Sequence, residues 1–143
     1  MFFPDLGNAC QVDHGPHIRA IGWLSREHPF KSGQVQADFL AVLRTHLAAP
    51  MQPVIAMGFH SCELCEGTGP RAHGRRNIWI PSGECTYVAP ELIVHYIEAH
   101  NYRPPDEFIA AVLACPEQES VEYYKLLRRF PCWWESESGQ FPR

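Results

Sequence analysis

Cysteine and histidine side chains carry most of the chemistry that this sequence offers. Cys62 and Cys65 stand at C-x-x-C spacing, and His60 precedes them in the run His-Ser-Cys-Glu-Leu-Cys. Two thiolates at this spacing can bind one tetrahedral ion through a tight backbone turn, and zinc prefers sulfur and imidazole ligands. Without an export signal, such a pair indicates metal or redox chemistry in a reducing compartment rather than a disulfide. The run therefore predicts half of a Zn²⁺ site.

The second pair of predicted ligands is His95 and His100, in the run His-Tyr-Ile-Glu-Ala-His of a helix expected over residues 90–100. At 100° per residue, the two histidines lie about 140° apart around an ideal helix. Either the last turn of the helix unwinds, or only one histidine binds the ion and His60 or Cys85 supplies the remaining ligand. His100 also falls within the apolar stripe of this helix, which is typical of a core histidine.

These ligands allow a structural or a catalytic ion. Two thiolates and two imidazoles would close a four-coordinate shell, which is typical of a structural site. A catalytic zinc instead keeps three protein ligands and a water, with a base nearby, and Glu91 or Glu98 would be that base. The sequence has no H-E-x-x-H motif and no cytidine-deaminase signature. A structural site is the favoured interpretation; the alternatives are a zinc-dependent hydrolase, a redox pair and a metal-free protein with reduced, buried cysteines.

The elements that must position these residues follow one another in a segregated order. We expect an α+β fold with a small, mostly antiparallel sheet packed with about four helices, the helices being concentrated in the C-terminal half. Apolar periodicity predicts the helices, and β-branched and aromatic runs predict the strands. The expected strands are 17–24 and 54–59, the hairpin is 77–88, and the helices are 34–48, 90–100, 105–115 and 118–130.

Composition limits the classes of protein to which the chain can belong. Its 143 residues are 45% hydrophobic and carry a formal net charge of −4. We expect a single domain over 1–143, with residues 1–16 and 133–143 as loop-like termini. The negative net charge argues against nucleic-acid binding. No apolar stretch is as long as a membrane span, which needs about 20 residues. A cytoplasmic location is expected.

Two further segments could serve a protein partner. The basic, Gly-rich loop 66–76 lacks the G-K-[ST] ending of a phosphate-binding loop, so a solvated loop is the favoured interpretation. Trp133 and Trp134 either anchor a partner or cap the core. We therefore expect a zinc-binding protein that acts through protein–protein interaction, as an adaptor or immunity-like protein. Its oligomeric state stays open.

One long segment also carries a resemblance. The run YVAPELIVHYIEAHNYRPPDEF at 87–108, preceded by GFHSCELC at 58–65, resembles a family of short bacterial proteins that share a domain of unknown function. Its motifs read HxCxxC and YVAPELIxHYIxxHxYxPPxEF. The resemblance spans most of residues 20–115 and implies a single-domain bacterial protein. It implies that the two ligand-bearing segments work together, and it implies no activity.

Overall fold

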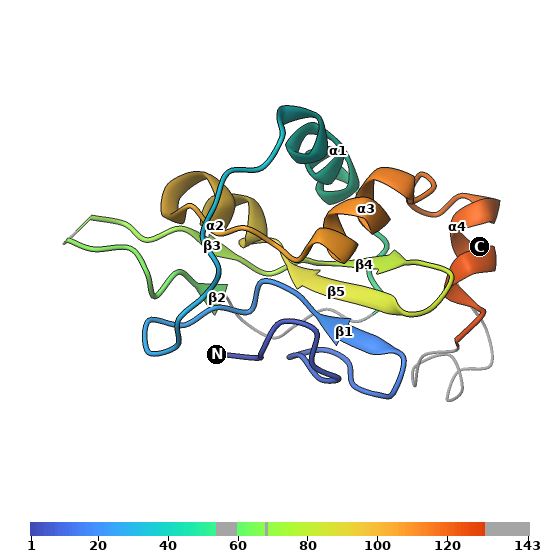
Figure 1. Ribbon diagram of the computed structural model, residues 1–143, viewed down its shortest axis with the longest axis horizontal. Helices are drawn as coiled ribbons and strands as arrows, with labels where there is room; N and C mark the ends of the chain where they lie inside the picture. The colour runs from blue at the N-terminus through green and yellow to red at the C-terminus, as the bar shows by residue number, and fades with distance from the viewer. Residues whose placement is uncertain (54–59, 68, 131–143) are drawn as a thin grey trace.

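The computed structural model describes residues 1–53, 60–67 and 69–130 of an α+β chain. Three of its four helices follow the last strand, so the helices lie mostly in the C-terminal half, as predicted (Figure 1). In chain order the elements are β1 (Ile18–Ala20), α1 (Ala37–Ala48), β2 (His60–Ser61), β3 (His73–Gly74), β4 (Asn77–Pro81), β5 (Thr86–Pro90), α2 (Ile93–His100), α3 (Asp106–Ala114) and α4 (Val121–Leu127).

The larger sheet has three strands in the order β1-β5-β4. The predicted hairpin forms its antiparallel half, with Asn77 opposite Pro90 and Pro81 opposite Thr86. β1 lies parallel to β5, with Ile18 opposite Thr86, so the sheet is mixed. Every residue of β4 and β5 is buried, because the sheet is covered on both faces.

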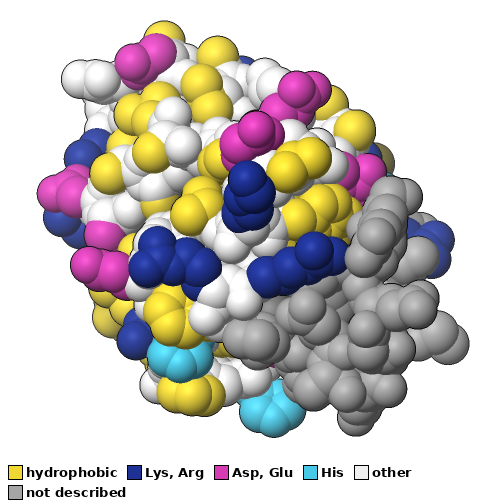
Figure 2. Space-filling model, turned by 90° about the vertical axis from the view of Figure 1, so that its right-hand side faces the viewer, with side chains coloured by type: hydrophobic (Ala, Val, Ile, Leu, Met, Phe, Trp, Pro, Cys, Tyr) yellow, Lys and Arg dark blue, Asp and Glu magenta, His cyan; other side chains and the backbone are white. Residues whose placement is uncertain are grey.

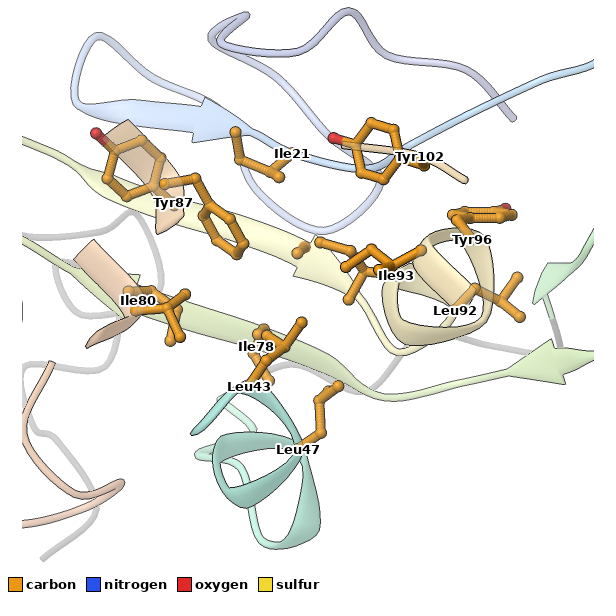
Figure 3. Packing of buried hydrophobic residues seen from close by; sticks show 14 of the residues in the cluster. Ile21, Leu43, Leu47, Ile78, Ile80, Tyr87, Leu92, Ile93, Tyr96 and Tyr102 are labelled. Carbon is orange, nitrogen blue, oxygen red and sulfur yellow. The ribbon is translucent and has the colours of Figure 1, made fainter. Parts of the chain in front are cut away.

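Alternating residues of the hairpin divide the core into two layers. Ile78 and Ile80 face α1 and α3, whose Leu43 and Phe108 belong to the same buried cluster. Figure 3 shows Leu43 and Leu47 of α1 directed at Ile78. On the other face, Trp79 packs with residues of β1 and α4. This period-two division is what a pleated strand imposes on its side chains.

Several expected elements are shorter in the structure: strand 17–24 is Ile18–Ala20, and helix 118–130 is Val121–Leu127. The helix expected over 90–100 begins only at Ile93, because Pro90 still belongs to β5 and pairs with Asn77. The N-terminal segment contains no strand within its described residues, yet it is tied to β1 and the residues after it. Leu6 donates its backbone N–H to the Ala20 carbonyl, and Phe3 forms a bridge with Trp23. The expected strand 54–59, the two tryptophans and the tail 133–143 lie outside the described residues.

A second, two-stranded antiparallel ribbon of β2 and β3 lies at the opposite end of the molecule from α4 (Figure 1). Around the α4 end, Figure 2 shows basic, acidic and apolar side chains interspersed over one face. Among the helices in the described part of the chain, none is long and apolar enough to cross a membrane.

Candidate metal centre

The β2–β3 ribbon supports the cysteine turn, residues Cys62–Cys65, which we call the knuckle. His60 pairs with Gly74 and Ser61 with His73, and the Cys62 N–H donates to the Ala72 carbonyl at 2.8 Å. Burial and the adjacent Cys65 side chain raise the pKa of the Cys62 thiol, although the backbone N–H groups of Leu64 and Cys65 act to lower it. Because a thiolate is the form that binds metal, an ion would have to displace the thiol proton.

Helix α2 ends directly at the second histidine. His100 is its last residue, and Asn101 follows in the left-handed conformation with φ 55°. Asparagine tolerates this conformation because its short polar side chain can hydrogen-bond locally. The Asn101 N–H donates to the Tyr96 carbonyl and closes the helix end. The α-helix therefore continues through both histidines and ends after His100.

Four side chains from the knuckle and α2 converge at one point. The sulfur atoms of Cys62 and Cys65 and one ring nitrogen each of His95 and His100 all lie within 4.8 Å of one another. Cys62 is buried and the other three are half-buried. Among the described residues they form a group that could hold a metal ion.

Four of the six distances between donor atoms in this cluster are 3.2–3.6 Å, and all six are within 4.8 Å. Cys62 Sγ lies 3.4 Å from His100 Nε2, and Cys65 Sγ lies 3.3 Å from His95 Nε2. Cys65 Sγ is 3.6 Å from His100 Nε2, and the two Nε2 atoms are 3.2 Å apart. The imidazole planes cross at 78°. Each histidine thus presents Nε2 to the same small volume as the two sulfur atoms.

The angular separation of His95 and His100 does not keep their ring nitrogens apart. Each side chain extends far enough from the helix for its Nε2 to reach the same point, while α2 continues through His100. The unwinding considered from the sequence is therefore unnecessary. Burial and the adjacent His100 both lower the pKa of His95. A neutral imidazole is the form that binds a metal ion.

Two other ligand candidates lie outside the cluster. The His60 ring stacks on Trp23 with a centroid distance of 5.9 Å, and burial lowers the pKa of His60. Within the described part of the chain, neither of its ring nitrogens has a hydrogen-bond partner. Cys85 is buried near the β4–β5 turn, with its sulfur 3.8 Å from the Ser82 hydroxyl. The structure thus unites four of the five predicted ligands without His60 or Cys85.

The two carboxylates considered as general bases are both paired with arginines. Glu91 accepts hydrogen bonds from the Arg76 guanidinium at 2.7 and 2.9 Å. Partial burial raises the pKa of Glu91, but Arg76 and the backbone N–H of Arg75 outweigh it and hold the pKa below its usual value. Glu98 forms an ion pair with Arg44. A carboxylate held in its ionised form by a guanidinium is a weak base.

Sequence reasoning missed two arginines beside the knuckle. Arg26 donates to the carbonyl oxygens of Glu63 and Cys65, and Arg71 donates to that of Cys62. Arg71 belongs to the loop 66–76 that the sequence suggests is solvated. No spacing or motif could have revealed these contacts, because each links an isolated arginine to backbone atoms.

The fold and the cluster define a small α+β protein with a Cys2His2 group between a ribbon and a helix. The chain belongs to the family Domain of unknown function (DUF7919), whose model matches residues 1–113. This match confirms the resemblance to a domain of unknown function, and it includes all four members of the cluster. No curated protein and no solved structure matches the chain.

Proposed function

We propose that the protein binds one zinc ion at Cys62, Cys65, His95 and His100, and that the ion is structural. Zinc lies about 2.3 Å from sulfur and about 2.0–2.1 Å from nitrogen, so a tetrahedral ion separates two nitrogens by about 3.3 Å and sulfur from nitrogen by about 3.5 Å. The observed separations are 3.2 Å between the nitrogens and 3.3–3.6 Å for three of the four sulfur–nitrogen pairs. This agreement is the observation that supports zinc best.

The ion would add a link between two short elements that also share part of the apolar core. The strands of the ribbon are two residues long, and α2 has eight residues. Elements this short are marginal in water by themselves. Because the four ligands are brought together by folding, the free energy of metal binding would contribute to the stability of this region.

A structural role agrees better with the surroundings of the cluster than hydrolysis does. Four protein ligands fill the tetrahedral shell, whereas a catalytic zinc keeps one position for water. The arginine partners of Glu91 and Glu98 also oppose their use as bases. The zinc-dependent hydrolase is therefore the weaker alternative.

A structural ion performs no chemistry, so the function of the protein must lie elsewhere. We propose that the protein binds a protein partner in the cytoplasm, in an adaptor or immunity-like role. The net charge of −4 would favour a basic partner, because opposite charges accelerate association.

The test is elemental analysis of protein purified without added metal. We expect about one zinc per chain in the wild type and none in the Cys62→Ser, Cys65→Ser double variant, which should also lose thermal stability. Cys115→Ser, at another half-buried thiol, is the matched control and should keep its zinc. His60→Gln should keep it too, because His60 lies outside the cluster.

Two results would contradict the proposal in different ways. A well-folded wild type without metal would remove the zinc site altogether. X-ray absorption showing three protein ligands and one water oxygen would keep the zinc but favour the hydrolase. In that case, replacing Glu91 or Glu98 by glutamine would become the next measurement.

A further inference from the structure

Two guanidinium groups from separate parts of the chain donate hydrogen bonds to the backbone carbonyls of the knuckle. Arg26, in the loop after β1, donates from Nε to the Glu63 carbonyl at 2.9 Å and from Nη2 to the Cys65 carbonyl at 3.4 Å. Arg71, in the arm that leads to β3, donates from Nη1 to the Cys62 carbonyl at 3.1 Å. Three of the four knuckle carbonyls are thereby hydrogen-bonded to a cation.

The hydrogen bond from Arg26 to the Glu63 carbonyl acts on the backbone between the two cysteine ligands. The Glu63 carbonyl and the Leu64 N–H belong to one planar trans peptide, in which they point in opposite directions. This peptide lies between Cys62 and Cys65, so the Arg26 contact restrains the backbone that joins the two sulfur ligands.

Both arginines also lie on the same side of the knuckle. Together with Glu27 and Glu63, they line a hollow of about 250 Å³ beside it. Their side chains are exposed to solvent, so the packing of the apolar core does not depend on them. Their contacts with the knuckle carbonyls distinguish them from ordinary surface arginines.

From this geometry we infer that Arg26 and Arg71 are positioning residues of the metal site, which fix the knuckle peptides so that the Cys62 and Cys65 sulfur atoms are held ready for the ion. The inference rests on the proposed zinc site. Groups of this kind, which bind ligands rather than metal, typically change metal affinity by about 10–100-fold when removed.

The two arginines should differ in what can replace them. Arg71 makes a single hydrogen bond to the knuckle, which a lysine ammonium can supply. Arg26 uses two nitrogens of its planar fork on two different carbonyls, and lysine cannot reproduce that geometry. Arg71→Lys should therefore restore zinc affinity, while Arg26→Lys should restore it only in part.

The experiment measures zinc affinity by competition with a chromophoric chelator, and the absorption spectrum of the cobalt-substituted protein, for the wild type, Arg26→Met, Arg26→Lys, Arg71→Met and Arg71→Lys. Arg19→Met is the matched control. Arg19 lies in β1 and donates to two backbone carbonyls outside the knuckle, those of Pro16 and Ile18, at 2.8 Å. We expect about 10–100-fold weaker binding in the two methionine variants and wild-type affinity in Arg19→Met. The thiolate-to-cobalt band should shift in Arg26→Met.

The outcomes separate this inference from the proposed function. A wild type that binds no zinc defeats both. A wild type that binds zinc, with Arg26→Met and Arg71→Met equal to it in affinity and spectrum, overturns the positioning role alone. Equal weakening in Arg19→Met also overturns it, because the effect would then come from general destabilisation. Circular dichroism of each variant reports whether it is folded. If a methionine variant is unfolded, the corresponding lysine variant is compared with the wild type instead.

Discussion

The β4–β5 hairpin and the β2–β3 ribbon are both antiparallel, but they bury very different surfaces. All residues of β4 and β5 are buried, whereas in the ribbon only Gly74 is. The hairpin is covered by helices and the N-terminal segment on its two faces. The ribbon, the knuckle and α2, which together we call the metal corner, are linked by thiol and imidazole groups in addition to the apolar residues of α2.

This difference shows two ways of holding short strands in place within one chain. At the hairpin, apolar side chains leave water, and the free energy gained is roughly proportional to the area removed. At the metal corner, polar groups with fixed directions meet at defined distances, and their strength depends on pH and on a bound ion. The two regions should therefore respond to different perturbations.

The largest expected effect is on the hairpin side, from Phe108→Ala in α3. Phe108 is fully buried, and its ring contacts Tyr87 and Phe39 edge-on. Removing a buried phenylalanine and leaving a cavity costs about 3–5 kcal/mol. Urea denaturation should show this loss in the free energy of unfolding, while the zinc content of the folded variant stays at the wild-type value.

Leu113→Ala, on the exposed side of the same helix, is the matched control. Its effect should stay within about 0.5 kcal/mol. If Phe108→Ala also abolished zinc binding in folded protein, the metal corner and the sheet would not respond to separate perturbations.

Removing the metal should act at the other end. At a free zinc concentration 100 times the dissociation constant, bound metal stabilises the state that holds it by about 2.7 kcal/mol. Chelation should therefore speed hydrogen exchange in the metal corner, for example at the Cys62 N–H that donates to Ala72. Amides paired between β4 and β5 should keep most of their protection. Equal loss of protection in both regions would show that the ion supports the whole fold.

Much of the hairpin side could be predicted from the sequence, because local apolar periodicity determines it. The helix expected over 34–48 is Ala37–Ala48, and the hairpin lies where alternation and a Pro-Ser-Gly-Glu turn place it. The parallel pairing of β1 with β5 could not be predicted. It joins segments far apart in the chain, and nothing in the local pattern of either strand specifies it.

For the metal corner, the sequence could predict which residues take part but not how they are arranged. Residue type and spacing identified all four members of the cluster, since thiols and imidazoles are few and chemically distinctive. Spacing could not decide how His95 and His100 share one point, because a helical wheel gives the direction of each side chain but not how far its ring reaches. It could not separate His60 from the ligands either, because its stacking on Trp23 is a tertiary contact.

The smallest expected effect concerns His46 in α1, which tests whether the apolar side of the molecule has a pH dependence of its own. His46 is buried, its Nδ1 lies 3.1 Å from the Gln118 amide nitrogen, and burial lowers its pKa below the usual value near 6.5. Since the unfolded chain then binds a proton more readily, this contribution to stability is complete above about pH 6.5 and is lost as the pH falls through that value toward the lower pKa of the folded state.

His46→Gln should therefore lose less stability than the wild type between about pH 7.5 and 5.5, measured by urea denaturation with chelator present throughout so that zinc release does not contribute. His60 and His95, whose pKa values are also lowered by burial, remain in both proteins and cancel in the comparison. Identical losses in the two proteins would place the acid sensitivity of the fold outside α1.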